Sequence, residues 1–369
     1  MAKSSAKHIL QPSSYNFLRS YINNPSPTGF ESSGQVMWMD YLRPYVDEFF
    51  TDPYGSAAGV INPGATFKVV IEAHADEISW FVNYVSPEGL LYLKRNGGVD
   101  HQIAPSKRVL IHGKKGIVKA VFGWPAIHTR LSNNDSKEPQ PKVENLFLDC
   151  GARNRKEVEA LGIHIGAVVT YEEGYDELSN GFLIGRAFDN RIGGFMIAEV
   201  ARLLKENRKK LPYSLYVVNA VQEEIGLRGA EMMARRIKPD VAIITDVTHD
   251  STTPMINKII EGECHCGKGP SLCYGPAVHN KLLEHVEQVA VKNKVPVQFR
   301  TVSRSTGTDT DSFAYANDGC PSVLISIPLR YMHTTVEMIH KDDIENTIRL
   351  MYESLLALTP KTNLSYFKK

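Results

Sequence analysis

Helices and strands alternate regularly over the second half of the chain, and this alternation constrains the fold more than any other feature of the sequence. The expected strands include YSLYVVNAV, VAIITD and SVLISIP, with helices expected over residues 190–209, 229–237, 280–293 and 341–359. This order is typical of an α/β protein with a mixed, largely parallel sheet and flanking helices. Upstream, FKVVIEAHAD reads as a further buried strand, preceded by two helices over residues 13–50 that are broken at NPSPTGFES.

Residues 78 to about 170 show a different sequence pattern. Short alternating runs such as GLLYLKRNG and GAVVTYEEG are separated by Gly, Pro and Asn, which predicts strands joined by turns rather than helices. We therefore expect a discontinuous α/β catalytic domain of residues 1–77 plus 179–369, with a small β-barrel-like domain of residues 78–178 inserted in it.

Bulk composition argues against several classes of partner. The 369 residues carry 42 Lys and Arg against 41 Asp and Glu, so neither a nucleic-acid surface nor a polybasic membrane contact is expected. No apolar run is long enough to span a bilayer, and the start, MAKSSAKHIL, lacks the apolar core of a secretory signal. The five cysteines are an odd number in a long chain, so we expect reduced thiols and a cytoplasmic setting.

Acidic and histidine side chains follow the expected strands, where open α/β sheets form their binding sites. FKVVIEA is followed by His74 and Asp76, YSLYVVNAVQ by Glu223 and Glu224, VAIIT by Asp246, and SVLISIPLRYM by His333, while Asp189 precedes a long helix that Asn190 could cap. These five carboxylates and two imidazoles would repel one another at one sheet edge unless cations lay between them. His and carboxylate ligands suit zinc, cobalt or manganese better than calcium.

The number of carboxylates favours two metal ions. Two ions roughly 3.5–4 Å apart share a bridging carboxylate and a water or hydroxide. The ligands left over would then supply a general base for that water and a group that holds a histidine ligand in place. Asp76, two residues beyond His74, is well placed for the second task. Of Glu223 and Glu224, one would bind metal and the other would face the water.

The chain resembles the M42 family of metallo-aminopeptidases, which comprises glutamyl, deblocking and TET-type aminopeptidases. The resemblance lies in AHADEISWFV, GRAFDNRIGG, VQEEIGLRGA, IITDV and YMHTTVEMIH, which occur in the family's order, and it extends to PSPTGFES and GTDTDSFAYANDGCPSVLISIP. It covers nearly the whole chain. It implies a zinc-peptidase-like fold and hydrolysis of the first peptide bond of peptides that have a free N-terminus.

The resemblance also implies a role for each residue of the site. Asp189 would bridge two divalent ions, zinc or cobalt with manganese as an alternative; Glu224 and His333 would complete one site, and His74 and Asp246 the other. Glu223 would be the general base for a metal-bridging hydroxide nucleophile, and Asp76 would orient His74. The inserted domain would mediate dimerisation, and dimers would build a homo-oligomer, up to a dodecamer.

Departures from the family concern the substrate side of the site. Thr310 and Asp311 follow the GTD motif where the family usually has a small residue, so the preferred N-terminal residue is not inherited from relatives. Arg304, Arg330 and Lys341 could line a pocket for an acidic side chain, although ordinary surface charge is the simpler reading.

Cys264, Cys266 and Cys273, with His279, could be drawn as a further zinc site. Their spacing fits no common zinc pattern, so reduced cysteines packed near the sheet are the better interpretation. Two other functions remain open. Paired carboxylates also serve glycoside hydrolases such as cellulases, although that chemistry leaves His74 and His333 unexplained. An inactive scaffold that keeps the fold is the third reading, which the complete set of ligands argues against.

Overall fold

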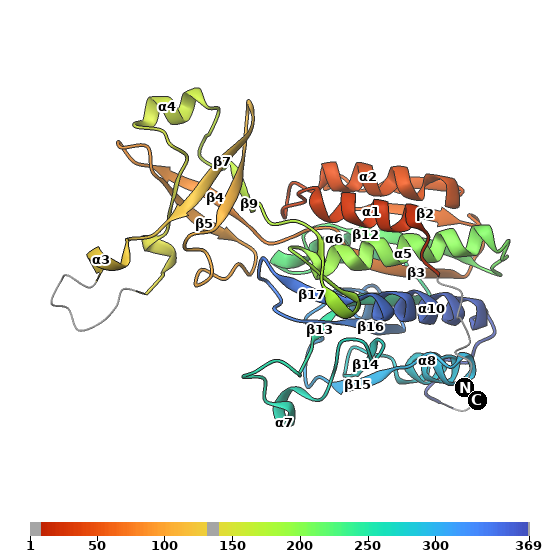
Figure 1. Cartoon of the computed structure of the whole chain (residues 1–369). Coiled ribbons are helices and arrows are strands. Elements are labelled where there is room, and N and C mark those ends of the chain that lie inside the picture. Colours follow the sequence, from red (N-terminus) through yellow and green to blue (C-terminus); the bar gives the residue numbers. More distant parts are fainter. Residues whose placement is uncertain (1–8, 131–139, 368–369) are drawn as a thin grey trace.

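A mixed eight-stranded sheet forms the centre of the molecule, in the order β1-β2-β12-β3-β13-β16-β14-β15 (Figure 1). The computed structural model describes residues 9–130 and 140–367. The strands are β1 (Glu48–Thr51), β2 (Ala57–Ile61), β3 (Lys68–His74), β12 (Ser214–Ala220), β13 (Val241–His249), β14 (Ser271–Tyr274), β15 (Gln298–Thr301) and β16 (Ser322–Leu329). Strands β12, β3, β13 and β16 run parallel, whereas β2 and β14 join them antiparallel. The carboxyl ends of the four parallel strands therefore meet at one edge of the sheet.

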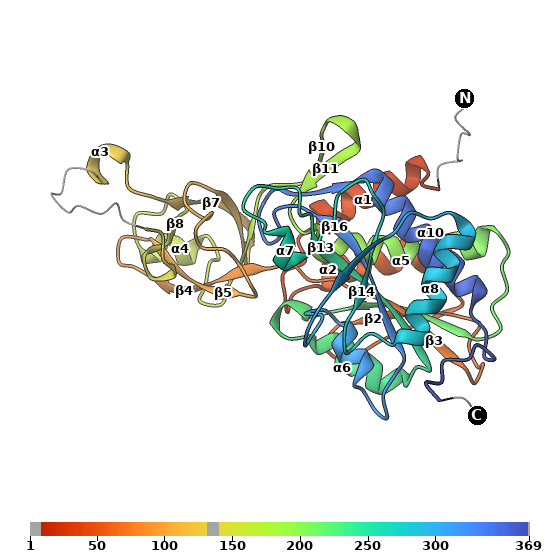
Figure 2. The ribbon, with the colours of Figure 1, turned by 90° about the horizontal axis from the view of Figure 1, so that it is seen from below.

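Helices cover both faces of this sheet, as the sequence predicts. One face carries α1 (Pro12–Asn23), α2 (Ser32–Leu42), α5 (Phe188–Glu206), α8 (Asn280–Asn293) and α10 (Lys341–Ala357); the other carries α6 (Arg228–Ile237) (Figure 2). Helix α9 (Thr310–Ala314) packs beside α6 on that second face. Helix α5 packs between the sheet and the outer helices and is buried over most of its length. A short helix, α7 (Lys258–Glu261), lies in the connection from β13 to β14.

The predicted second helix is wrong at its end. Helix α2 stops at Leu42, and a 3-10 turn, η1 (Arg43–Tyr45), follows. Pro44 lacks the N–H that a continuing helix needs and disfavours helical backbone in the residue before it. The apolar residues beyond it form β1 instead, because pairing with β2 places Phe49 opposite Gly59.

The inserted region forms a closed barrel, which lies to one side of the main sheet (Figure 1). Its strands are β4 (Ser79–Val85), β5 (Leu91–Asn96), β6 (Arg108–Gly113), β7 (Gly116–Gly123), β8 (Phe147–Asp149) and β9 (Val168–Tyr171), accompanied by α3 (Ile127–Arg130), α4 (Arg155–Ala160) and η2 (Val143–Asn145). Trp80, Phe122 and Leu148 belong to a core of its own. This confirms the prediction of an inserted β-barrel, whose closure removes exposed strand edges.

A small sheet leads the chain back from the barrel to α5. It consists of β10 (Asp176–Glu177), β11 (Phe182–Gly185) and β17 (Glu337–His340), with η3 (Ser179–Gly181) between the first two strands. Because β3 leads directly into the barrel strand β4, the carboxyl edge of the main sheet faces the barrel. Within the described residues, every helix is too short or too polar to cross a bilayer.

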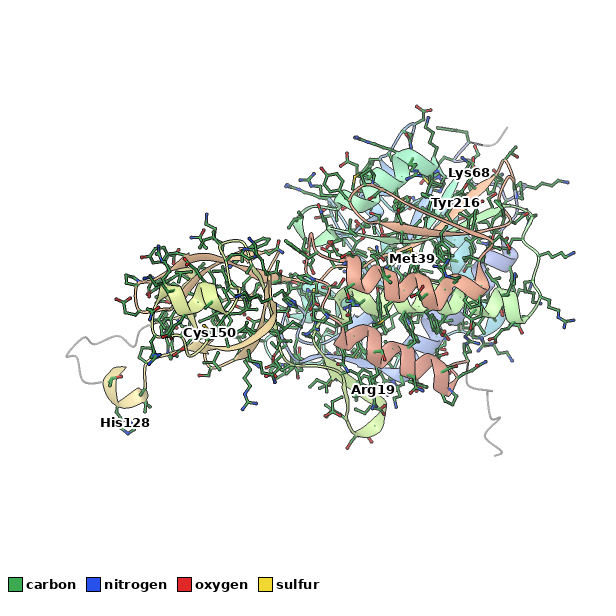
Figure 3. All side chains as sticks on the ribbon, turned by 90° about the horizontal axis from the view of Figure 1, so that it is seen from above. Arg19, Met39, Lys68, His128, Cys150 and Tyr216 are labelled. Atoms are coloured by element: carbon green, nitrogen blue, oxygen red, sulfur yellow. The ribbon has the colours of Figure 1, made fainter. Side chains whose placement is uncertain are left out.

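All five cysteines are free thiols, as expected. Cys150 lies in the barrel region, away from the main sheet (Figure 3). Burial raises the pKa of Cys264 to about 12, which is unfavourable for a thiolate ligand. Among the described residues, none of the groups able to hold a metal ion contains a cysteine.

Candidate metal centre

The seven side chains predicted from the sequence gather at the carboxyl edge of the main sheet. They are His74 at the end of β3, Asp76 just beyond it, Asp189 at the start of α5, Glu223 and Glu224 in the 3-10 turn η4 (Glu223–Ile225), Asp246 in β13, and His333 after β16. Asp246 lies inside its strand rather than after it, because β13 pairs with β16 as far as His249.

Three groups of these side chains have ligand atoms within 4.8 Å of one another. One consists of His74, Asp189 and Asp246, a second of Asp189, Glu224 and His333, and a third of His74, Glu223 and Glu224. The first two groups share Asp189 and together contain all five residues predicted as metal ligands.

The carboxylate of Asp189 lies between the two imidazoles. Its Oδ1 is 3.2 Å from His74 Nε2, and its Oδ2 is 3.3 Å from His333 Nε2. Burial alone would raise the pKa of Asp189, but the two imidazoles outweigh burial and hold that pKa below its usual range. The next residue, Asn190, accepts a hydrogen bond from the N–H of Gly193 at 3.1 Å, so it caps the regular part of α5 as expected.

Asp76 lies behind this cluster, fully buried, and joins two of its parts. Its Oδ1 is 3.3 Å from His74 Nδ1. The same carboxylate accepts hydrogen bonds from the backbone N–H groups of Glu223 and Glu224 at 3.0 and 3.2 Å, and from the Thr28 hydroxyl at 2.9 Å. The histidine ring and the turn that carries both glutamates are therefore held by one side chain.

Two residues that support the cluster were not predicted from the sequence. The buried carboxylate of Glu337 accepts the backbone N–H of Asp189 at 3.0 Å and that of His333 at 2.9 Å. The carbonyl oxygen of Gly98, in the loop after β5, lies 3.2 Å from His333 Nδ1 and so leaves Nε2 free to face Asp189. A Cβ at Gly98 would come within 2.8 Å of the His333 ring, so this approach requires glycine.

Glu72 and Asp309 form a second layer of carboxyl groups beneath the cluster. Both side chains are buried, and none of their four oxygens has a hydrogen-bond partner among the described residues. Burial raises the pKa of Glu72 to about 8, and burial together with Glu72 raises the pKa of Asp309. A charged residue within the apolar run FKVVIEA was the signal in the sequence for Glu72.

The carboxylates of the cluster outnumber its two histidines. Burial raises the pKa of Glu223 to about 10 despite the favourable effect of His74, and the neighbouring Asp309 and Asp246 contribute. Burial likewise raises the pKa of Asp246 to about 7, with Asp189 adding to the effect. Bound cations would oppose both shifts and favour the ionised carboxylates.

The residues present fit divalent cations. Carboxylate oxygens lie 3.2–3.4 Å from the Nε2 atoms of His74 and His333. Two ligands of one tetrahedral zinc ion stand about 3.4 Å apart, given bonds of about 2.1 Å. Glu224 Oε1 is buried without a hydrogen-bond partner in the described part of the chain, as expected of an atom that awaits a ligand.

Comparison with known proteins identifies the family. The profile of the M42 glutamyl aminopeptidase family matches residues 55–350. A lysyl aminopeptidase of Pyrococcus furiosus is 31% identical over 349 residues, which cover 94% of this chain and 98% of that protein. The crystal structure of a TET aminopeptidase from a marine-sediment Thaumarchaeota archaeon superposes with a TM-score of 0.90 at 30% identity, over 95% of this chain and 98% of that one.

A more distant match shows the same fold. The TET1 peptidase of Pyrococcus horikoshii, described as able to assemble into a tetrahedron or a large octahedral shell, superposes with a TM-score of 0.81 at 23% identity, over 92% of this chain and 98% of that one. With a three-layered α/β/α body, a barrel insertion and an acidic cluster with two histidines, the molecule has the architecture of a hydrolase of the exopeptidase class. The chain belongs to the M42 family of aminopeptidases.

Proposed function

We propose that this aminopeptidase uses two divalent metal ions that share Asp189. The observation that carries the proposal is the position of the Asp189 carboxylate, whose two oxygens face different histidines, each accompanied by a further carboxylate. In this arrangement His74 and Asp246 hold one ion, and Glu224 and His333 hold the other. Zinc and cobalt suit these ligands, and manganese is the alternative.

Such ions would polarise the scissile carbonyl group and lower the pKa of a water molecule toward about 7. Glu223, which lines the cavity beside the cluster, is the general base that takes a proton from the attacking water and passes it to the leaving amine. Asp76 and Glu337 act through other residues: they hold His74, His333, Asp189 and the glutamate turn in position.

The substrates are peptides with a free N-terminus. We further propose that residues 78–178 form a domain through which two copies of the chain pair, and that such pairs assemble into larger homo-oligomers in the cytoplasm. The oligomeric assembly described for the TET1 relative supports this part of the proposal. Light scattering coupled to size exclusion tests it, and a monomer at working concentration contradicts it.

Hydrolysis of aminoacyl-p-nitroanilides tests the catalytic proposal. Activity should require added cobalt or zinc and should disappear with a chelator. Absence of hydrolysis for every aminoacyl group would leave an inactive scaffold, and chelator-resistant hydrolysis of carboxymethyl-cellulose would point to glycosidase chemistry instead.

Elemental analysis of Asp189→Asn tests the shared ligand. Because both ions use Asp189, the variant should lose more than one ion per chain, whereas Asp246→Asn should lose one. Asp343→Asn is a matched control that should keep both ions, since this buried carboxylate lies outside the cluster and accepts the backbone N–H groups of Gly267 and Gly269. Retention of both ions by Asp189→Asn would contradict the bridging role.

A further inference from the structure

The cavity beside the metal centre extends well beyond the residues that the proposed chemistry uses. Its volume is about 610 Å³, and its walls include Arg300 and Asp311 in addition to Glu223 and His333. A single amino-acid side chain of a bound peptide fits within this space. Since the family includes relatives named for glutamyl and for lysyl substrates, membership alone leaves the preferred side chain open.

The carboxylate of Asp311, which lines the cavity, already has hydrogen-bond partners. The carboxylate of Asp311 accepts backbone N–H groups of Thr306 at 3.0 Å and of Gly307 at 3.2 Å. These bonds fix the loop that precedes α9 and compensate the negative charge. Asp311 is therefore a poor partner for a lysyl or arginyl side chain of a substrate.

Arg300, in contrast, has no hydrogen-bond or ion-pair partner among residues 9–130 and 140–367. It lies on the edge strand β15 and contributes to the cavity wall, and its Nε is screened from solvent without a hydrogen-bond acceptor among the described residues. No carboxylate in the described part of the chain forms an ion pair with it, although most other arginines there have one or a backbone carbonyl. A guanidinium that is partly withdrawn from water without an acceptor is unfavourable unless a ligand supplies one.

His249 is a second basic side chain that lines the cavity. It lies at the end of β13 and is exposed. Burial lowers the pKa of His249, and the positive charge of Arg300 lowers it further.

The basic residues suggested by the sequence do not serve this cavity. Arg330 Nε is bound to Asp250 at 2.8 Å, and Lys341 Nζ to Glu177 at 2.6 Å. Arg304 is exposed and lies outside the cavity wall. Arg300 is left as the arginine that faces the cavity without a partner.

We propose that Arg300 is the specificity-determining residue of this aminopeptidase and binds the side-chain carboxylate of an acidic N-terminal residue, glutamate or aspartate. A guanidinium presents paired N–H donors that match both oxygens of a carboxylate, and a charge-assisted pair of this kind is strengthened where water is excluded. The inference rests on the proposed function, because it takes the substrate's amino terminus to lie at the metal centre.

Kinetics on matched p-nitroanilides test the proposal. The glutamyl and glutaminyl compounds differ only in charge, and the metal-loaded wild-type protein should favour the glutamyl compound in kcat/KM. Arg300→Met keeps length without charge and should abolish this preference, which corresponds to a drop of about 10- to 100-fold on the glutamyl substrate. Its activity on the glutaminyl compound should change little, and Arg300→Lys should retain part of the preference.

Arg304→Met is the control, since it removes an arginine charge four residues away without touching the cavity, and it should behave as wild type. Equal kcat/KM for the glutamyl and glutaminyl substrates in the wild-type protein would overturn the proposal while leaving the aminopeptidase function intact. The proposal would also be overturned if the wild-type protein preferred dipeptides to dipeptide amides and Arg300→Met removed that preference, because Arg300 would then bind the terminal carboxylate.

A binding measurement decides the inference independently of turnover. L-glutamate should raise the melting temperature of the metal-loaded wild-type protein more than L-glutamine does, and this difference should vanish in Arg300→Met but persist in Arg304→Met. No difference between the two amino acids would overturn the proposal. If no p-nitroanilide were hydrolysed at all, the proposed function would fail, and this melting experiment would still test the role of Arg300.

Discussion

Two groups of buried charge lie along helix α5, and they differ in how their charge is balanced. In the middle of the helix, the Glu199 carboxylate accepts hydrogen bonds from Arg202 Nη2 at 2.8 Å, from the Ser14 hydroxyl at 2.8 Å and from the Tyr41 hydroxyl. At its start, Asp189 belongs to a cluster in which carboxylates outnumber the histidines and Glu224 Oε1 lacks a donor among the described residues.

The difference separates a structural role from a functional one. The Glu199 group supplies its own cation and its own donors, so it is complete without any bound species. The metal-centre cluster is complete only when cations enter it, which is the state in which its carboxylates are ionised together. A buried group of carboxylates without enough cations to balance their charge therefore marks the functional site. The following experiments test this distinction between the two groups.

Arg202→Met should have the largest effect on stability. The variant leaves Glu199 buried without its cation, which costs about 3 kcal/mol in the free energy of unfolding. Denaturant titration measures this loss. The folded variant should keep normal metal content and activity, so a loss of metal would show that the two groups of charge are not independent.

Glu223→Gln should have the largest effect on turnover. The variant removes the proposed general base but none of the proposed metal ligands, so kcat should fall by at least about 10²-fold while elemental analysis finds a near-normal metal content. If Glu223→Gln lost metal and Glu224→Gln did not, the roles of the two neighbours would be exchanged.

Glu337→Gln should have an intermediate effect. The amide can accept only one of the two backbone N–H groups that the carboxylate now accepts from Asp189 and His333. Looser positioning of both residues should weaken metal binding by about 10-fold, as measured by competition with a chromogenic chelator. Unchanged affinity would show that these backbone contacts do not position the ligands.

Asp343 is a case between the two groups, because among the described residues its carboxylate has backbone donors but forms no ion pair. Burial outweighs those donors and raises the pKa of Asp343 to about 6. The native state therefore binds more protons than the unfolded state between the ordinary aspartate pKa of about 3.9 and that value, and this contribution to stability falls as pH rises through the window.

Asp343→Asn should remove this contribution, which is at most about 1.4 kcal/mol per pH unit. Denaturant titrations of both proteins at several pH values across the window measure the difference. A difference that grows in the opposite direction would contradict the raised pKa.

The sequence was informative wherever regular geometry determines position. Helix–strand alternation predicts the parallel centre of the sheet, and the ends of parallel strands meet, so the sequence alone predicts that His74, Asp246 and His333 lie together. The short strands β1 and β2 were not recognised, because their pairing partners rather than their own residues determine their conformation.

Contacts between segments that are far apart in the sequence cannot be predicted from such local patterns. Arg300 reaches the cavity only because β15 forms the far edge of the sheet, and Asp309 matters only because it faces Glu72. Arg300 belongs to no local pattern, and the GTD motif that contains Asp309 does not show that this residue faces Glu72. By contrast, Arg330 and Lys341 looked equally suitable in the sequence, and their pairing with Asp250 and Glu177 removes them from consideration.

The contact between Gly98 and His333 bears on how this chain can be engineered. Trimming the barrel to obtain a minimal enzyme would also remove the carbonyl that braces one imidazole, so a shortened chain would lose alignment at the centre as well as the proposed pairing surface. Substitutions confined to the outside of the barrel avoid that confusion and are the cleaner way to separate assembly from chemistry.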